Sequence, residues 1–279
     1  MTPLRKQYSE YLTLRGYSDR TKESYLAAVG ALAKHYWRRP DRISELEIRD
    51  YLLLLHRKGR SFSTINVAVS ALRLFYAEVL KRPVDRLGDH LPRTGRAIKR
   101  PRVYSKEELR RLFASCPDVL GRALLLTIYG AGLRLNEACH LRVSDIESDR
   151  MMLRIEQGKG AKDRYTILSP WLLRELRRHW RCSRPRTWLF PSRRDPERPM
   201  LDGTAQKLFY AALQRAGLPN RGGIHCLRHS FATHFLEEGG DLPTLKKLLG
   251  HAYFSTTAGY VQVSRERTAG VSSPLQPTH

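Results

Sequence analysis

One stretch of the chain divides it into two regions of different character. From Asp89 to Arg102 the sequence is rich in proline, glycine and basic residues and shows no sustained apolar period, which is typical of a linker. The 279 residues suffice for two domains of ordinary size, each with its own core. We expect one domain over residues 1–88, a basic linker over 89–101, a larger domain over 102–262 and a tail over 263–279. The basic residues of the linker either contact phosphates or form a plain exposed connection.

The first region predicts a bundle of helices. Apolar residues recur every three or four positions through residues 4–14, 19–36, 44–55 and 61–79, which is the period of an amphipathic helix. Ser18, Ser44 and either Ser61 or Ser63 stand where N-caps are expected. Pro83 ends the pattern, so we expect four helices before it.

The second region mixes helices with a small β-hairpin. The run from Ser105 to Glu108 is a capping box that opens a helix, and the apolar residues 121–129 predict a buried helix. Strand-like runs over 151–156 and 164–168 flank a glycine-rich turn. Further helices are expected over 170–180, 204–216, 227–238 and 242–249. The predicted fold class is therefore mainly α, with a small β-sheet or hairpin in the second domain.

The charge of the chain points to a polyanionic partner. Its 50 lysines and arginines outnumber its 27 acidic residues and give a formal net charge of +23, more than solubility requires. Because the basic residues are spread over the whole chain, nucleic acid is favoured over a membrane surface; a merely basic soluble protein is the alternative. The longest apolar stretches are shorter than the roughly 20 residues of a membrane span, and no apolar signal core begins the chain, so we expect a cytoplasmic location. The four cysteines are scattered without paired spacing, as is typical of reduced thiols.

Two residues near the C-terminus are suited to hold a phosphate. His225 and Arg228 are spaced i, i+3, so a helix that begins near His225 presents both side chains on one side of its N-terminal end. Backbone N–H groups and the helix dipole favour an anion there, and the guanidinium adds a bidentate contact. Taken alone, a His-x-x-Arg pattern is more often a pair of exposed side chains that bind no ligand.

Two further basic residues strengthen this prediction. Arg134 follows a Gly-Ala-Gly break, where the backbone can approach a ligand closely, and Glu137, three residues later, can orient its guanidinium. A second arginine suits a phosphorane with two charged oxygens. Lys159 stands in the glycine-rich turn, where an ammonium group can protonate a leaving oxygen; Lys162 is its competitor in the same turn.

A metal site is the alternative use of the histidines. Their spacing fits zinc poorly, because adjacent residues face different ways and residues five apart on a helix do not share a face. No close carboxylate cluster suggests a two-metal nuclease. We therefore expect neither a metal nor another cofactor. The candidate metal ligands in this region are His225, Cys226, His229, His234 and His251.

Several motifs, in this order, resemble those of the tyrosine recombinases, also called phage integrases. They are Gly132-Leu-Arg134-x-x-Glu137, Gly158-Lys159-Gly, His225-x-Leu-Arg228-His-Ser, Leu248-Leu-Gly-His251 and Tyr260. The resemblance covers the chain from Arg102 to Tyr260, with features of both Xer-like and integron-type enzymes. It implies a two-domain DNA clamp: a helical core-binding (SAM-like) domain and a tyrosine-recombinase catalytic domain.

The resemblance also implies roles for six residues. Tyr260 would attack the scissile phosphate and form a 3′-phosphotyrosyl link, although Tyr253 is a rival nucleophile in the same stretch. Arg134 and Arg228 would stabilise the transition-state oxygens. Lys159 would be the general acid toward the departing 5′-oxygen, His225 would assist proton transfer at the tyrosine, and His251 would hydrogen-bond a non-bridging oxygen. The chemistry would need neither ATP nor a metal.

The implied activity is site-specific DNA recombination by an enzyme encoded on a mobile element. Its partners would be double-stranded DNA and three further copies of the chain, as a homotetramer on two DNA sites, with no membrane involved and a nucleoid-associated, cytoplasmic location. Two alternatives remain at this stage. One is a non-catalytic DNA-binding clamp, and the other is a type IB topoisomerase-like activity without strand exchange.

Overall fold

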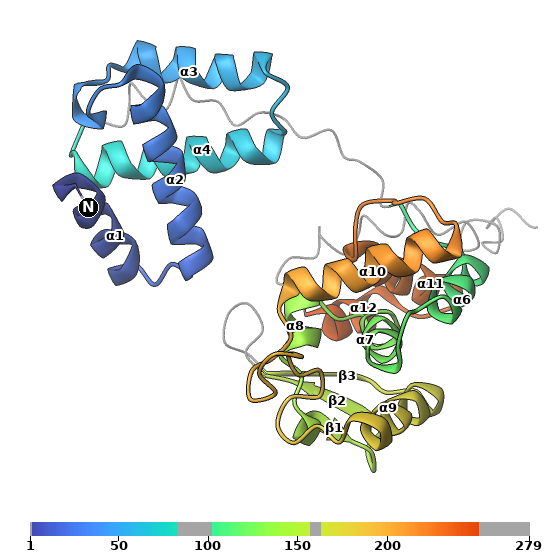
Figure 1. Ribbon diagram of the computed structural model, residues 1–279. Coiled ribbons are helices and arrows are strands. Elements are labelled where there is room, and N and C mark those ends of the chain that lie inside the picture. Colours follow the sequence, from blue (N-terminus) through green and yellow to red (C-terminus); the bar gives the residue numbers. More distant parts are fainter. Residues whose placement is uncertain (1, 83–101, 157–162, 251–279) are drawn as a thin grey trace, which may run out of the picture. The chain divides into compact units, whose positions relative to one another are not determined.

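A computed structural model describes residues 2–82, 102–156 and 163–250 of the chain. The chain divides into two compact units, Met1–Ile98 and Lys99–His279 (Figure 1). The predicted linker over 89–101 and the tail over 263–279 lie outside the described residues, so the domain boundaries stay predictions. Mostly helical structure with one small antiparallel sheet confirms the predicted fold class.

The first unit is a helical bundle, as predicted. Ser18 and Ser61 cap their helices by accepting the amide hydrogens of Thr21 and Thr64, while Ser44 forms a reciprocal capping box with Glu47. The predicted fourth helix does not run unbroken to residue 79, because its last part winds as a π-helix. The elements are α1 (Pro3–Leu14), α2 (Asp19–Tyr36), a 3-10 turn η1 (Pro40–Arg42), α3 (Glu45–Arg57), α4 (Phe62–Leu74) and the π-helix η2 (Phe75–Val79).

Buried aromatic residues hold this bundle together. Tyr8, Phe75 and Tyr76 are at most 1% exposed, and the Tyr8 hydroxyl donates a 2.8 Å hydrogen bond to the carbonyl oxygen of Ala71. The bond lets a phenol be buried without an unsatisfied polar atom, which would cost about 1–3 kcal/mol. It also ties α1 to α4.

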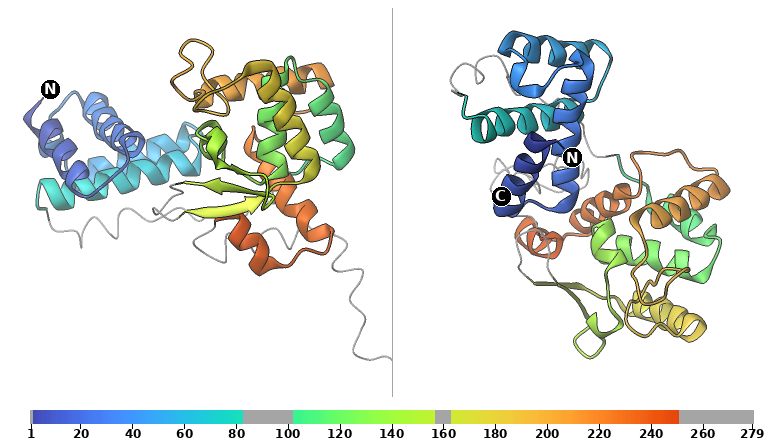
Figure 2. Two further views of the ribbon diagram at one scale, coloured as in Figure 1. Left: turned by 90° about the horizontal axis from the view of Figure 1, so that it is seen from below. Right: turned by 60° about the vertical axis from the view of Figure 1, so that its left-hand side comes forward.

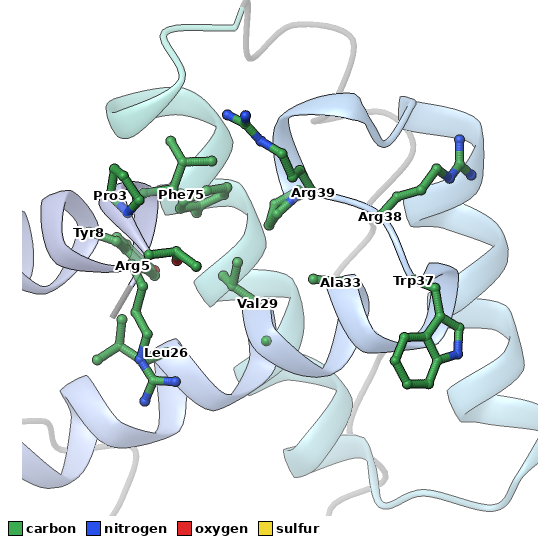
Figure 3. Close-up of a pocket in the computed structure, with 14 residues that line it drawn as sticks. Pro3, Arg5, Tyr8, Leu26, Val29, Ala33, Trp37, Arg38, Arg39 and Phe75 are labelled. Carbon is green, nitrogen blue, oxygen red and sulfur yellow. The ribbon is translucent and has the colours of Figure 1, made fainter.

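The first unit also contains a cavity of about 790 Å³. Its wall is mainly apolar, with Val29, Ala33 and Phe75 facing it, and three arginines and Trp37 stand at its edge (Figure 3). None of the candidate phosphate-binding residues lines it. The cavity therefore belongs to the bundle and not to the candidate site.

The second unit is built around one buried helix. In α7 (Val119–Gly130) every residue from Ala123 to Ile128 is buried, as expected of a helix that is apolar all round. It packs against α9 (Pro170–Ser183) and α11 (His225–Glu237). The remaining helices of the unit are α6 (Lys106–Ala114), α8 (Leu135–Cys139), a 3-10 turn η3 (Val143–Asp145), α10 (Asp202–Ala216) and α12 (Leu242–Leu249).

A three-stranded antiparallel sheet completes the second unit (Figure 2). Strands β2 (Met152–Ile155) and β3 (Arg164–Ile167) form the predicted hairpin, with Leu153 opposite Thr166. A third strand, β1 (Ile146–Glu147), pairs with β2 and was not predicted. Strand β3 contacts α12, so the sheet brings Arg164 to the end of that helix. No helix among the described residues is long and apolar enough to cross a membrane.

Candidate active site

A glycine turn between α7 and α8 brings Arg134 next to α11. Gly132 has a φ of +64°, and a Cβ atom there would lie 2.5 Å from the ring of Phe231 on α11. Both the backbone conformation and the close approach therefore require glycine. The carbonyl oxygen of Gly132 accepts a 2.7 Å hydrogen bond from Nη1 of Arg228, which fixes α11 against the turn.

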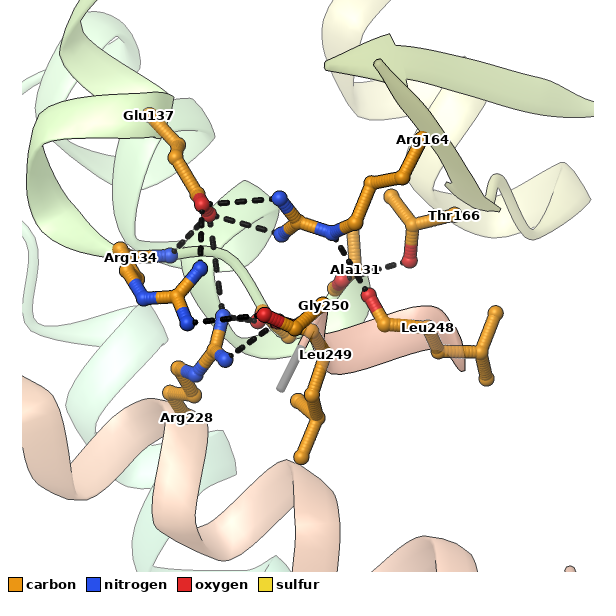
Figure 4. A network of polar contacts seen from close by, with 10 residues as sticks. Ala131, Arg134, Glu137, Arg164, Thr166, Arg228, Leu248, Leu249 and Gly250 are labelled. Atoms are coloured by element: carbon orange, nitrogen blue, oxygen red, sulfur yellow. Dashed lines mark hydrogen bonds and ion pairs between the residues drawn. The ribbon is translucent and has the colours of Figure 1, made fainter. Parts of the chain in front are cut away.

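The Glu137 carboxylate holds three arginines from three elements (Figure 4). Arg134 donates from its backbone N (2.8 Å) and from Nη1 (2.7 Å). Arg164 binds both carboxylate oxygens, each at 2.8 Å, in the bidentate geometry that guanidinium favours. Nη1 of Arg228 lies 3.7 Å from Oε2.

The resulting arginine cage, which we define as Arg134, Glu137, Arg164 and Arg228, carries a net positive charge. Three guanidiniums and one carboxylate sum to +2. Burial would raise the pKa of Glu137, but the hydrogen bonds and charges of Arg164 and Arg134 outweigh burial and lower that pKa to about 2. Arg228 is only 4% exposed, whereas the Arg134 side chain is 31% exposed. The cage therefore keeps its net positive charge at neutral pH and is open to solvent at Arg134, as a site for an anion requires.

The same three arginines bind the last three carbonyl oxygens at the end of α12. Nε of Arg164 donates to Leu248 O at 3.0 Å, Nη2 of Arg228 to Leu249 O at 2.6 Å, and Nη2 of Arg134 to Gly250 O at 3.2 Å. Carbonyls at a helix C-terminus lack partners within the helix and carry partial negative charge. The arginines satisfy them and fix the end of α12.

The end of α12 requires a glycine at position 250. Gly250 ends α12 with a φ of +62°, and a Cβ atom would lie 2.7 Å from Cδ of Arg164. A side chain here would displace the guanidinium that binds Glu137. The next residue along the chain is His251.

His225 lies at the start of α11, beside the cage. Its side chain is exposed, yet partial removal from water, followed by the positive charges of Arg228 and Arg134, lowers the pKa of His225 below its ordinary value of 6.5. Burial, with His225 and Arg228 nearby, lowers the pKa of His229 to about 4. Both imidazoles are therefore neutral at pH 7 and able to accept a proton.

His234 and Cys226 of the candidate metal set have other surroundings, and His251 lies outside the described residues. Nδ1 of His234 is 2.9 Å from the hydroxyl of Tyr129, and Cys226 is buried in the apolar core. Within residues 2–82, 102–156 and 163–250, no three His, Cys, Asp or Glu side chains are grouped as metal ligands.

The structure thus brings together Arg134, His225 and Arg228, three of the six predicted site residues. The other three, Lys159, His251 and Tyr260, lie outside the described residues, as do the rival candidates Lys162 and Tyr253.

Comparison with known proteins gives the family. Residues 102–267 match the model of the phage integrase family, and residues 4–86 match that of its N-terminal SAM-like domain. A Sinorhizobium fredii protein assigned as an integrase/recombinase is 39% identical over 99% of this chain and 89% of its own length. The chain belongs to the phage integrase family. It is a tyrosine recombinase, an enzyme that cleaves and rejoins DNA strands in site-specific recombination.

A further relative agrees with the family, and a solved structure agrees with the fold. The tyrosine recombinase XerA of Thermococcus kodakarensis is 32% identical over 94% of this chain and 91% of its own length. A lambda integrase tetramer bound to a Holliday junction shares the fold, with a TM-score of 0.74 and 20% identity over 90% of this chain and 77% of that one. Structural neighbours of this phage integrase thus include DNA-bound complexes.

Arg164 is the cage residue that the sequence analysis missed. It begins β3 two residues before Thr166, which is buried, so strand alternation puts both side chains on the inner face. An arginine that faces a core needs a carboxylate partner, and Glu137 had already been singled out. Strand alternation thus indicated that Arg164 needs a buried acidic partner, but it did not indicate which carboxylate that partner is.

Replacing the carboxylate of this recombinase should cost stability in a pH-dependent way. The pKa of Glu137 is lowered from 4.5 to about 2 in the folded chain. Its charge therefore stabilises the fold above about pH 4.5, by about 3 kcal/mol, and this contribution is lost as the pH falls toward about 2. We expect Glu137→Gln to lower the free energy of unfolding by that order at pH 7, measured by urea denaturation, and by progressively less in acid.

The matched control is Glu107→Gln. Glu107 pairs with Arg110 at 2.5 Å, but their side chains are 68% and 73% exposed, and exposed pairs contribute at most about 1 kcal/mol. An equal loss for both variants, or a loss for Glu137→Gln that does not change with pH, would contradict the account of the cage.

Proposed function

We propose that the chain recombines DNA through a 3′-phosphotyrosyl intermediate formed by Tyr260. The observation that carries the proposal is the arginine cage. Two arginines of the family motif, Arg134 and Arg228, converge on one carboxylate with an excess of positive charge. His225, neutral at pH 7, stands beside them. This is the set of groups that a phosphodiester undergoing in-line attack requires.

In the proposed first step, the phenol oxygen of Tyr260 attacks the scissile phosphorus. The O–P bond to the tyrosine forms as the bond to the 5′-oxygen breaks; His225 receives the phenol proton and Lys159 gives a proton to the departing 5′-oxygen. Arg134 and Arg228 stabilise the two non-bridging oxygens, with a hydrogen bond from His251. A 5′-hydroxyl of another strand reverses the step, so no energy source is consumed.

The start of α11 supports phosphate binding by this site. The helix has 13 residues and begins at His225, so its peptide dipoles present their positive end beside the guanidinium of Arg228. The amides of Cys226 and Leu227 in this first turn already donate to the carbonyl oxygens of Gly223 and Ile224. These dipoles and the three arginines supply positive charge without a metal ion.

We further propose that four copies of the chain act on two double-stranded DNA sites. The tetramer named for lambda integrase supports this by analogy of fold. In each copy, residues 1–88 would serve as a core-binding domain and residues 102–262 as the catalytic domain, joined by the basic linker over 89–101. The tail over 263–279 and a nucleoid-associated location belong to the same proposal.

Tyr260→Phe should abolish covalent adduct formation and leave DNA binding intact. The phenylalanine retains the ring and lacks only the attacking oxygen. The measurement is trapping of the full chain on a nicked duplex that carries its recombination site, read as a gel shift that survives denaturation. Tyr253→Phe is the matched control and should form the adduct at the wild-type level, with or without EDTA.

Other outcomes would favour the alternatives. If the wild-type chain binds its verified site but forms no adduct, the chain is a non-catalytic clamp. If it relaxes supercoiled plasmid and yields no recombinants, the topoisomerase-like activity replaces recombination. If adduct formation is lost in Tyr253→Phe and not in Tyr260→Phe, the nucleophile is Tyr253.

The pH dependence of cleavage should depend on the cage. Partial removal from water, followed by the positive charges of Arg228 and Arg134, lowers the pKa of His225, so the single-turnover cleavage rate should decline in acid only below the ordinary histidine value. Arg134→Gln removes one charge, which raises that pKa, and we expect the acid limb to move to higher pH. Arg134→Lys keeps the charge, so the acid side of its pH–rate profile should not move, even though the cleavage rate is lower at every pH. An equal limb shift in both variants would exclude this electrostatic cause.

Arg164 should be a positioning residue for the same reaction. It holds both Glu137 and the carbonyl of Leu248, three residues before His251. A misplacement of about 1 Å costs roughly 100-fold in rate, so we expect Arg164→Lys to slow adduct formation by up to that factor without weakening DNA binding. Arg154→Lys on β2, whose pairs with Asp145 and Glu156 lie outside the cage, should leave the rate unchanged.

A further inference from the structure

The solvent-facing side of α9 carries four arginines in one stripe. All four are exposed, and their i, i+3, i+4, i+7 spacing puts them on one side of the helix. The opposite side, with Leu172 and Leu176, is buried in the core. We call the exposed set the α9 arginine stripe: Arg174, Arg177, Arg178 and Arg181.

No carboxylate on α9 neutralises this stripe. Glu175 is the single acidic residue in the helix sequence, and it pairs with Arg122 of α7 at 3.2 Å, with the two side chains 16% and 27% exposed. Among the ion pairs of the described residues, none involves the stripe. Four positive charges without an ion pair among the described residues therefore face solvent within eight residues.

Exposed tryptophans flank the stripe. Trp171 is 44% exposed and Trp180 is 39% exposed, and the guanidinium carbon of Arg184 lies 4.3 Å from the ring centroid of Trp180. Arginine and tryptophan are enriched where proteins bind partners, whereas lysine and glutamate dominate bare surface. The composition of this face is therefore that of a binding surface.

The stripe lies apart from the arginine cage. Arg164, the first residue of β3, belongs to the cage, and α9 starts at Pro170, beyond the other end of that strand. Figure 1 shows α9 at one end of the sheet. At about 3.3 Å per residue, six extended residues span about 20 Å.

We propose that the α9 arginine stripe binds the phosphate backbone of a second DNA duplex, distinct from the one cleaved at the cage. Guanidinium forks match phosphate oxygens, and the chain has a net charge of +23. From Arg174 to Arg181 the helix rises about 10 Å, which is the length of about three phosphates at 3.4 Å per strand. Recombination joins two duplexes, so a second duplex is present whenever the enzyme acts.

The test uses the full chain saturated with an unlabelled duplex of its recombination site. A labelled duplex of scrambled sequence is then titrated and followed by fluorescence anisotropy at several salt concentrations. The test variants are the quadruple Arg→Gln and the quadruple Arg→Lys changes of the stripe. Cleavage is not needed, so the result is independent of whether Tyr260 is the nucleophile.

Binding of the labelled duplex should depend on the stripe. We expect the Gln variant to bind about tenfold or more weakly at low salt, and its salt slope to fall by about 0.9 for each phosphate that the stripe no longer neutralises. The Lys variant keeps the charges and should retain the wild-type slope. Arg110→Gln with Arg198→Gln, two exposed arginines that pair with Glu107 and Asp195, is the control and should bind as wild type.

Three results would overturn the proposal. The first is unchanged binding by the Gln variant, provided that its circular dichroism spectrum and melting temperature match the wild type. The second is no binding of the labelled duplex to the loaded wild-type chain. The third is equally tight, stripe-dependent binding of polyglutamate or of phosphatidylserine vesicles at the same ionic strength, which would assign the stripe to an acidic protein or to a membrane surface.

Discussion

The ion pairs of Glu137 are the interaction on which the rest of the site depends. One carboxylate gathers arginines from the start of α8, from β3 and from α11. Without it, the three guanidiniums would repel each other; any two like charges about 4 Å apart repel by about 4 kcal/mol at an effective dielectric constant of 20. The low pKa of Glu137 keeps its carboxylate charged well below pH 4.5. The carboxylate offsets the repulsion among the three guanidiniums. The remaining net positive charge is what the proposed phosphate binding would use.

The cage also joins the sheet to the end of α12. Each of its arginines also donates a hydrogen bond to a backbone carbonyl oxygen. Arg164 binds that of Leu248, Arg228 that of Leu249 and Arg134 that of Gly250. The positive φ of Gly250 and its contact with Arg164 leave no room for a side chain. The same arginines therefore stabilise the fold and form the proposed phosphate site. A substitution that disrupts the cage should weaken phosphate binding and also release the end of α12, which precedes His251.

Local patterns in the sequence were enough to predict the longer helices, the hairpin, and the shared side of His225 and Arg228 on α11. Each of these follows from a periodicity, a cap or an i, i+3 spacing. Arg134 was paired with Arg228 on chemical grounds and on the family resemblance, and the five-residue helix α8 was not predicted. The third strand was missed because Ile146–Glu147 is too short to show a period, and the π-helix because Phe75–Val79 keeps the apolar spacing of the helix before it. The contact of Arg164 with Glu137 joins residues 27 positions apart, and its bond to Leu248 spans 84. Such contacts depend on how a strand meets two helices, which no local pattern encodes.

The electrostatics of the cage connect substrate binding to the basicity of His225. The charges of Arg228 and Arg134 lower the pKa of that imidazole in the free protein. A phosphate diester bound among them brings one negative charge, which offsets part of the positive field because opposite charges favour the protonated ring. The proton affinity of His225 therefore rises when the substrate is present and is low when the site is empty. In the proposed reaction, the bound phosphate would thus make His225 a stronger base than it is in the empty site, at the step in which the tyrosine proton has to be removed.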